Sequence, residues 1–229
     1  MNSLHRVLTL TVFSATLAAG VSARQVEDPV RSYGRSWGGQ VTLTNSGFGL
    51  GGHLRVPIDT RTSVTAEASI GAGKDAREVA FFDRFGRRDV LNKANYLLMV
   101  PAHLGLERRL FRDRIEDDFR PFVLLVMGPT LGWESPYFTD ENDNGILDPG
   151  EQTYDALSSI PRGRPKFGVG GTFAIGAHFG RGSGMSQGVR IGYSFARFSE
   201  GVQLLEEGIK EPQRFFGTPQ IIVYFGRLF

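Results

Sequence analysis

Residues 62–73 read TSVTAEASIGAG, and apolar and polar side chains alternate along this stretch. Side chains two residues apart share one face of a β-strand. From Val64 onward, one face therefore carries only apolar residues, whereas the other carries threonine, glutamate, serine and glycine. The members of the apolar face are Val64, Ala66, Ala68, Ile70 and Ala72. This alternation predicts an amphipathic β-strand.

The same period of two recurs along the chain, and a helical period is scarcely seen. The alternating segments give eight expected strands, at 36–44, 48–57, 62–73, 94–106, 121–133, 167–179, 188–198 and 215–229. The first two depend on a tight turn at Asn45-Ser46-Gly47, whose residues favour a hairpin. The sequence thus predicts an all-β fold, an eight-stranded antiparallel up-and-down transmembrane β-barrel.

The first 23 residues are typical of a secretory signal peptide. Arg6 precedes an apolar stretch at 7–19, and small residues ending at Ala23 follow it. An uncleaved anchor helix is the alternative, but the apolar stretch is short for spanning a bilayer. We expect cleavage near Ala23, a polar periplasmic lead-in at 24–35 and a barrel over 36–229.

The charge balance excludes nucleic acid as a partner. The chain has 26 Lys and Arg against 24 Asp and Glu, and cleavage would remove Arg6, leaving 25 minus 24, a net charge of +1. Such a balance provides no basic field for nucleic acid. Cysteine is absent, so disulfides play no part. Beyond the signal peptide no segment approaches the length of a transmembrane helix, so a membrane location requires a closed barrel.

The distribution of glycine and aromatic residues indicates which face of the strands meets lipid. A soluble barrel buries its apolar face, whereas a membrane barrel turns that face outward. Glycine and other small residues gather on the polar face, as a narrow lumen requires. Large aromatics gather near strand ends, as at lipid interfaces: Trp37, Phe48, Tyr96, Trp133, Phe179, Phe215 and Phe229. We therefore expect the apolar face to meet lipid.

The last expected strand ends on Phe229, with Ile221, Val223 and Phe225 at two-residue steps before it. This resembles the C-terminal signature of bacterial outer-membrane proteins, whose final aromatic is read by the barrel-assembly machinery. Arg227 departs from that pattern, which usually has an apolar or aromatic residue there. In segment count and loop asymmetry the chain resembles small barrels of the OmpA/OmpX type. The resemblance implies an outer-membrane monomer with a filled interior in contact with lipid and lipopolysaccharide, and no particular function.

The spacers between expected strands differ in length. Long extracellular loops are expected at 74–93, 134–166 and 199–214, and short periplasmic connections at 58–61 and 180–187. The charged segment 107–120, ERRLFRDRIEDDFR, is expected to be a connection with a short helical turn. Pro101, Pro129 and Pro219 each lack a hydrogen-bond donor, so bulges or strand ends are expected there.

The sharpest motif is the segment 140–151, DENDNGILDPGE. Counted as twelve positions, it resembles the loop of an EF-hand, without the flanking helices. Positions one, three, five, seven, nine and twelve supply the expected ligands, which are Asp140, Asn142, Asn144, the Ile146 carbonyl, Asp148 and Glu151. Gly145 takes the sharp turn. An acidic, turn-forming loop is the alternative, and we predict a structural Ca²⁺ site.

Six polar residues are expected to project into the lumen: His53, Arg55, Glu67, His103, His178 and Arg190. A metal, proton or gating site is one interpretation. A hydrogen-bonded polar plug is favoured, because an eight-stranded interior is only wide enough for side chains. That narrowness also argues against a diffusion porin.

These features favour a non-enzymatic structural or surface-binding scaffold. Two alternatives stay open, a lipid A-modifying hydrolase and a narrow gated channel. A hydrolase would use Ser69 or Ser194 as nucleophile and His103 or His178 as base, although no G-x-S-x-G elbow marks a serine. One outer loop also offers candidate contacts to lipopolysaccharide or a partner, with a solvated loop as the alternative: Phe81, Phe82, Arg84, Arg87 and Arg88.

Overall fold

The computed structural model describes residues 34–228, apart from 83, 85–87, 113, 116–117, 143, 181–183, 207 and 209–210. The expected signal peptide, most of the polar lead-in and Phe229 lie outside the described residues. In the part of the chain that is described, no helix is both long and apolar enough to cross a membrane.

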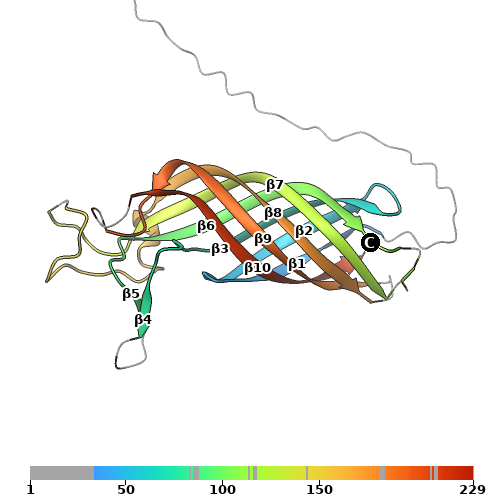
Figure 1. Cartoon of the computed structure of the whole chain (residues 1–229), viewed down its shortest axis with the longest axis horizontal. Coiled ribbons are helices and arrows are strands. Elements are labelled where there is room, and N and C mark those ends of the chain that lie inside the picture. Colours follow the sequence, from blue (N-terminus) through green and yellow to red (C-terminus); the bar gives the residue numbers. More distant parts are fainter. Residues whose placement is uncertain are drawn as a thin grey trace, which may run out of the picture. The chain divides into compact units, whose positions relative to one another are not determined.

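Eight strands form a closed antiparallel barrel in the order β1-β10-β9-β8-β7-β6-β3-β2 (Figure 1). They are β1 (Ser36–Thr44), β2 (Gly47–Pro57), β3 (Thr62–Gly73), β6 (Asn95–Arg109), β7 (Phe119–Pro136), β8 (Arg164–Phe179), β9 (Met185–Val202) and β10 (Gln213–Leu228). Each barrel strand pairs with the next along the chain, and β10 closes on β1. The predicted eight-stranded up-and-down fold is therefore confirmed.

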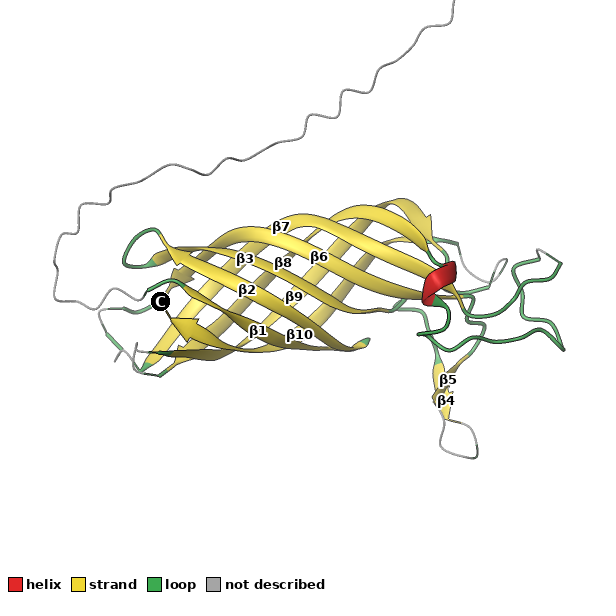
Figure 2. Cartoon of the chain, turned by 180° about the vertical axis from the view of Figure 1, so that it is seen from behind, coloured by secondary structure: helices red, strands yellow, loops and turns green. Residues whose placement is uncertain are grey.

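The two ends of the barrel differ (Figure 2). At one end, called here the terminal end, β1 begins and β10 finishes, and the connections are 58–61, 110–118 and 180–184. At the other, called the loop end, long connections cover 74–94, 137–163 and 203–212. The first of these contains the hairpin of β4 (Ala80–Phe82) and β5 (Arg88–Val90), and the second contains the 3-10 helix η1 (Ile160–Arg162).

The barrel wall is lower on one side of the loop end. Strands β1, β2 and β3 have 9, 11 and 12 residues, whereas β6 to β10 have 15 to 18. The β1–β10 ladder stops at the pair Thr44 and Gln220, although β10 continues to Gln213. The β3–β6 ladder likewise stops at Gly73 and Leu97. The long strands thus rise above a notch on the side of β1 to β3.

Five of the fourteen residues in the charged segment 107–120 belong to strands, and the connection is limited to 110–118. Strand β6 reaches Arg109 and β7 begins at Phe119, so the prediction of a connection over the whole segment is wrong. Between them, the backbone N–H of Ile115 donates to the Phe111 carbonyl at 3.2 Å, as in a helical turn. The extra strand residues bring Glu107 and Arg120 into the barrel wall.

The prolines do not shift the strand register. The β6–β7 ladder has a two-residue gap between the pair of Pro101 with Thr130 and the pair of Leu104 with Met127. The register is the same on both sides of this gap. Pro129 lies in that gap, but its ladder with β8 runs unbroken past it, as does the ladder of Pro219 with β9. The expected bulges are therefore absent, because losing one N–H removes a single bond while the flanking pairs hold the register.

The outward face of the barrel is apolar and exposed. Every barrel strand contributes to it, with Leu43, Leu50, Ile70, Leu104, Leu125, Phe173, Ile191 and Val223. Leu104 and Leu125 are 60% and 54% exposed. A soluble monomer rarely leaves so large an apolar surface uncovered. The outward orientation predicted for the apolar face is thus confirmed.

Aromatic side chains gather at both ends of this apolar face. At the terminal end Trp37, Phe119 and Phe179 are exposed, and the ring centroids of the two phenylalanines are 5.8 Å apart. At the loop end Phe48 and Phe215 are exposed. Two aromatic girdles of this kind match the two interfaces of a lipid bilayer.

The barrel interior is filled by two apolar clusters as well as polar groups. One cluster lies toward the loop end and comprises Leu97, Ala196, Phe198, Val202, Leu204 and Phe216. The other comprises Phe122, Leu124, Val126, Ala174, Ile222 and Tyr224. Strands β7 and β10 are consequently apolar on both faces, which is why their alternation is weak in the sequence.

Candidate functional site

The polar residues inside the barrel include all six that alternation placed there. Arg55, His103, His178 and Arg190 are buried, and the Glu67 side chain is 8% exposed. His53 pairs with Glu67 across β2 and β3, and Glu67 pairs with His103 across β3 and β6. Their predicted inward projection is confirmed.

Glu107 joins two of these residues. Its Oε1 lies 3.1 Å from Arg55 Nη1 and 2.7 Å from His178 Nε2. Glu107 was not among the expected inward residues, because the segment 107–120 was expected to be a connection. Its position four residues after His103 puts both on one face of β6, and this spacing could have revealed it.

His178 is held on three sides. Its Nδ1 lies 2.6 Å from the Tyr224 hydroxyl, and its ring stacks on Phe122 with centroids 4.5 Å apart. Its Nε2 lies 2.7 Å from Glu107 Oε1 and 2.5 Å from Arg55 Nη1. A neutral imidazole can donate from Nε2–H to Glu107 and accept at Nδ1 from Tyr224. The ring is therefore fixed in one orientation.

A second ion pair joins Arg190 to Glu67, and Arg190 Nη2 also lies 3.3 Å from Gln40 Oε1. The two buried acids each have an arginine partner, and the buried Arg120 donates to the Gly180 carbonyl at 2.6 Å. Among the described residues, no group of three or more His, Cys, Asp or Glu is arranged to hold a metal ion. This arrangement is that of an ion-paired plug.

The serines considered for a hydrolase lie in a very small space. Ser69, Ser194 and His103 line one interior cavity of about 20 Å³. That volume holds roughly one water molecule. His103 Nε2 lies 3.4 Å from Thr130 Oγ1, and His178 is engaged elsewhere. No lipid substrate fits in such a cavity.

The loop 140–151 folds around its own side chains. The Asp140 carboxylate accepts from the backbone N–H groups of Asn144 (3.0 Å) and Gly145 (2.7 Å). Gly145 has φ +68°, in the left-handed region that favours glycine. Positions one, five and six therefore meet in a sharp turn.

The other expected ligands close the same loop. Glu151 accepts from the backbone of Glu141 at 3.0 Å and of Asp148 at 2.9 Å, so it reaches across ten positions. The side-chain amides of Asn142 and Asn144 donate to Asp148 Oδ2 at 2.8 and 2.9 Å. The three carboxylates thus bind backbone and amide groups instead of converging on one point.

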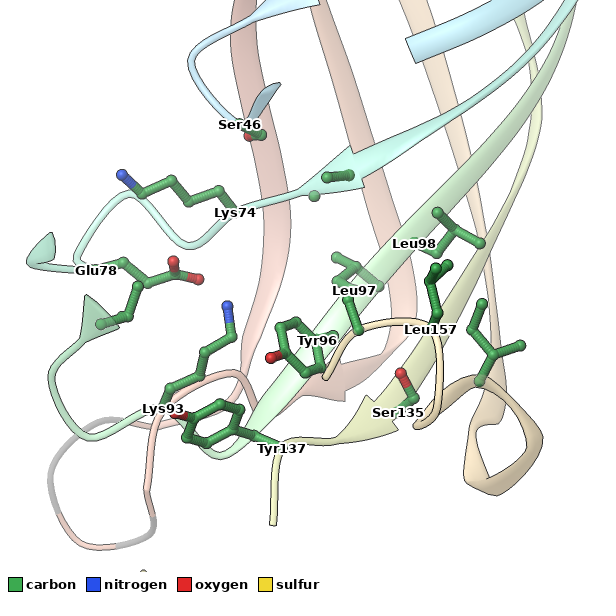
Figure 3. Close-up of a pocket in the computed structure, with 15 residues that line it drawn as sticks. Ser46, Lys74, Glu78, Lys93, Tyr96, Leu97, Leu98, Ser135, Tyr137 and Leu157 are labelled. Carbon is green, nitrogen blue, oxygen red and sulfur yellow. The ribbon is translucent and has the colours of Figure 1, made fainter. Parts of the chain in front are cut away.

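A pocket of about 430 Å³ opens at the loop end, beside the low part of the wall (Figure 3). The ends of β3 and β6 form one side, and the connections 74–94 and 137–163 form most of the rest, with Ser46 and Ser135. Lys93 Nζ lies 4.5 Å from the ring centroid of Tyr96, which packs edge-on against Tyr137 at 5.6 Å. This pocket was not predicted from the sequence, because its residues are scattered along the chain and match no motif.

Asp155 holds part of the pocket in place. Its carboxylate accepts from the backbone N–H groups of Leu157 (2.9 Å) and Ser158 (3.0 Å). The Ser158 hydrogen bond is the main cause that lowers the pKa of Asp155 below its ordinary value. This turn presents Leu157 to the pocket.

The loop residues proposed for lipopolysaccharide contact are only partly described. Phe81 is 44% exposed and Arg84 is exposed on the β4–β5 hairpin connection. Arg87 and the side chains of Phe82 and Arg88 lie outside the described residues.

Comparisons with known proteins give likenesses of structure alone. No family model and no curated protein matches the chain. The chain is similar to the N-terminal β-barrel domain of Pseudomonas aeruginosa OprF, with 6% identity, a TM-score of 0.42, and coverage of 85% of this chain and 98% of that one. It is also similar to Neisserial surface protein A, with 8% identity, a TM-score of 0.40, and coverage of 85% of this chain and 94% of that one. A third similar structure is Ail, the attachment invasion locus protein of Yersinia pestis. The identity is 11%, the TM-score is 0.37, and the coverage is 86% of this chain and 97% of that one.

Proposed function

We propose that this protein is an outer-membrane scaffold, without enzymatic activity, that presents its long connections at the cell surface. The observation that carries the proposal is a closed barrel whose exposed outward face is apolar and whose interior is filled. Only a closed barrel satisfies every backbone group of a β-sheet in lipid. The aromatic girdles at both ends support the same location.

The filled interior favours a scaffold over a gated channel. Two apolar clusters and two ion pairs lie within the wall, and the interior cavity lined by Ser69 and Ser194 measures about 20 Å³. Current recording in planar bilayers tests this directly. We expect no current steps across bilayers that contain the reconstituted protein. Discrete conductance steps would favour the channel.

The enclosed serines favour a scaffold over a lipid A-modifying hydrolase. Incubation of the detergent-solubilised protein with lipid A, followed by mass spectrometry, is the test. We expect unchanged lipid. Deacylated or newly acylated product would contradict the proposal.

The membrane location has its own test. A folded barrel migrates differently from a boiled one on a gel, so outer-membrane fractions are run with and without heating. We expect heat-dependent migration in the outer-membrane fraction. Recovery of the protein in the soluble fraction, without such a shift, would refute the location.

We also propose that the loop 140–151 binds a structural Ca²⁺ ion. Its donors are all oxygens, which a hard cation prefers, and Gly145 makes the turn that the spacing requires. Asp140, Asn142, Asn144, Asp148, Glu151 and the Ile146 carbonyl would hold the ion. The two asparagines must then present Oδ1 instead of Nδ2. Bound calcium would order the connection, whose ordering otherwise costs conformational entropy.

Calorimetric titration of calcium into wild type and Glu151→Gln tests this site, with protease cleavage of the loop as a second readout. We expect heat and protection in wild type, and a loss of both in the variant. Equal heat and equal protease resistance in the two proteins would defeat the calcium proposal.

A further inference from the structure

The notch in the barrel wall leaves the pocket beside it open to the outward side. Ala72 pairs with Leu98, and Gly73 pairs with Leu97, at the last positions of the β3–β6 ladder. Ala72 and Leu98 belong to the outward apolar face, whereas Leu97 belongs to the interior cluster. The pocket therefore begins where the apolar outer face of the barrel ends.

One side of this pocket is apolar. Leu97 and Leu98 lie there with Leu157, which is 78% exposed on the connection 137–163. Ala72 and Ile160 add further apolar surface. An uncovered leucine beside an apolar wall is unfavourable in water and favourable against hydrocarbon.

The opposite side carries charge. Figure 3 shows Lys74, Glu78 and Lys93 on one side of the pocket, facing Tyr96 and the leucines. Lys74 follows Ala72 by two residues, so its ammonium group stands just beyond the apolar face. Lysines at this level of a membrane protein lie among lipid headgroups.

We propose that the pocket binds the phosphorylated and acylated end of an outer-leaflet lipid. Lys74 and Lys93 receive a phosphate of the headgroup, and Leu98 and Leu157 pack against an acyl chain. The pairing of cations with an apolar wall matches an amphiphile rather than a soluble anion. A volume of about 430 Å³ is in the range of ligand sites and admits one headgroup with the start of a chain. The proposal rests on the membrane location argued above.

The test titrates the full barrel in detergent with bisphosphorylated lipid A and, separately, with dephosphorylated lipid A, using native mass spectrometry to count bound lipid. We expect the phosphorylated form to bind about 25-fold more tightly, since each of the two lysines contributes roughly fivefold in affinity near headgroups. The double variant Lys74→Gln and Lys93→Gln should abolish that preference. Leu157→Ser should weaken the binding of both lipids.

The matched control is Arg108→Gln with Arg197→Gln, which removes the same charge from exposed positions on β6 and β9, outside the pocket. We expect this control to keep the preference for phosphate. Equal affinity of the lysine variant and the control would overturn the proposal. So would equal binding of the two lipids, or complete displacement of lipid A by inorganic phosphate.

Heat-dependent gel migration of each variant distinguishes loss of the lipid site from failure of the barrel to fold in the membrane. A negative lipid result with normal migration removes the lipid site and leaves the barrel scaffold standing. A protein that does not enter the membrane removes both.

Discussion

Glu107 and His178 are 71 residues apart in the sequence, yet Glu107 Oε1 and His178 Nε2 lie 2.7 Å apart inside the barrel. Arg55 completes the group from β2, at 3.1 Å from the same carboxylate oxygen. Three non-adjacent strands, β2, β6 and β8, are thereby joined across the interior. Glu107 is thus the acid that contacts both Arg55 and His178 and links them.

Glu107→Gln is expected to destabilise the barrel by about 3 kcal/mol, because it leaves Arg55 as a buried charge without its carboxylate. Urea unfolding of the protein in lipid vesicles measures the free energy of unfolding. Glu200→Gln is the control, since Glu200 is 74% exposed and pairs with Lys166 at 3.3 Å. That variant should lose less than about 1 kcal/mol. Similar losses in both variants would contradict the role given to Glu107.

Gly226→Ala tests the closure of the barrel. Gly226 pairs with Gly38 across β10 and β1, and a Cβ on Gly226 would overlap the backbone carbonyl of Trp37. Backbone cannot yield as a flexible side chain can, so we expect a loss of about 2 kcal/mol or more and a smaller folded fraction. Heat-dependent gel migration and urea unfolding give the two readouts.

Gly52→Ala is the control for closure. A Cβ at Gly52 would meet the Gly38 carbonyl oxygen at 3.4 Å, which is an ordinary contact. We expect its stability to remain within about 0.5 kcal/mol of wild type. Equal behaviour of the two glycine variants would show that close packing at the β1–β10 pair is not required.

Alternation in the sequence predicted the barrel and the inward direction of its histidines, because a period of two assigns each side chain to a face. The same reasoning failed at Glu107 and Arg120, where a run of charges resembles a loop although the period continues into it. It was also weak at Leu124 and Ile222. Both faces of β7 and β10 are apolar, so the pattern does not mark which face is inside.

The pocket at the loop end could not be predicted from the sequence, for a different reason. Lys74, Lys93 and Leu157 come from two connections and meet only because β3 ends lower than β6. No local pattern encodes that difference in strand length. The hairpin of β4 and β5 was missed similarly, since strands of three residues are too short to show a period.

Acid should weaken the turn between β2 and β3. The backbone N–H groups of Arg61 and Thr62 donate to Asp59 Oδ1 at 2.5 and 2.7 Å, and the Arg61 bond is the main cause that lowers the Asp59 pKa below its ordinary value near 3.8. A lowered folded-state pKa stabilises the fold above the unfolded value and loses that effect as pH falls. We expect wild type to lose stability below about pH 4, and Asp59→Asn to lose less. Carboxyl NMR titration of Asp59 checks the pKa, and a value above 3.8 would contradict the argument.

Gly145→Ala is expected to weaken calcium binding by the loop 140–151. Gly145 has φ +68°, and a residue with a Cβ pays about 1 kcal/mol to adopt that conformation, so calcium affinity should fall roughly five- to tenfold. Glu141→Gln is the matched control, because Glu141 occupies position two of the loop, which supplies no side-chain ligand in the EF-hand pattern. Glu141→Gln removes one negative charge from the loop, whereas Gly145→Ala leaves the charge unchanged. A loss of calcium affinity caused by loop charge alone would therefore be seen only in Glu141→Gln. Calorimetry should give wild-type affinity, within about threefold, for Glu141→Gln. If Glu141→Gln weakens calcium binding as much as Gly145→Ala does, the ion is held by diffuse acidity instead of by the turn at Gly145.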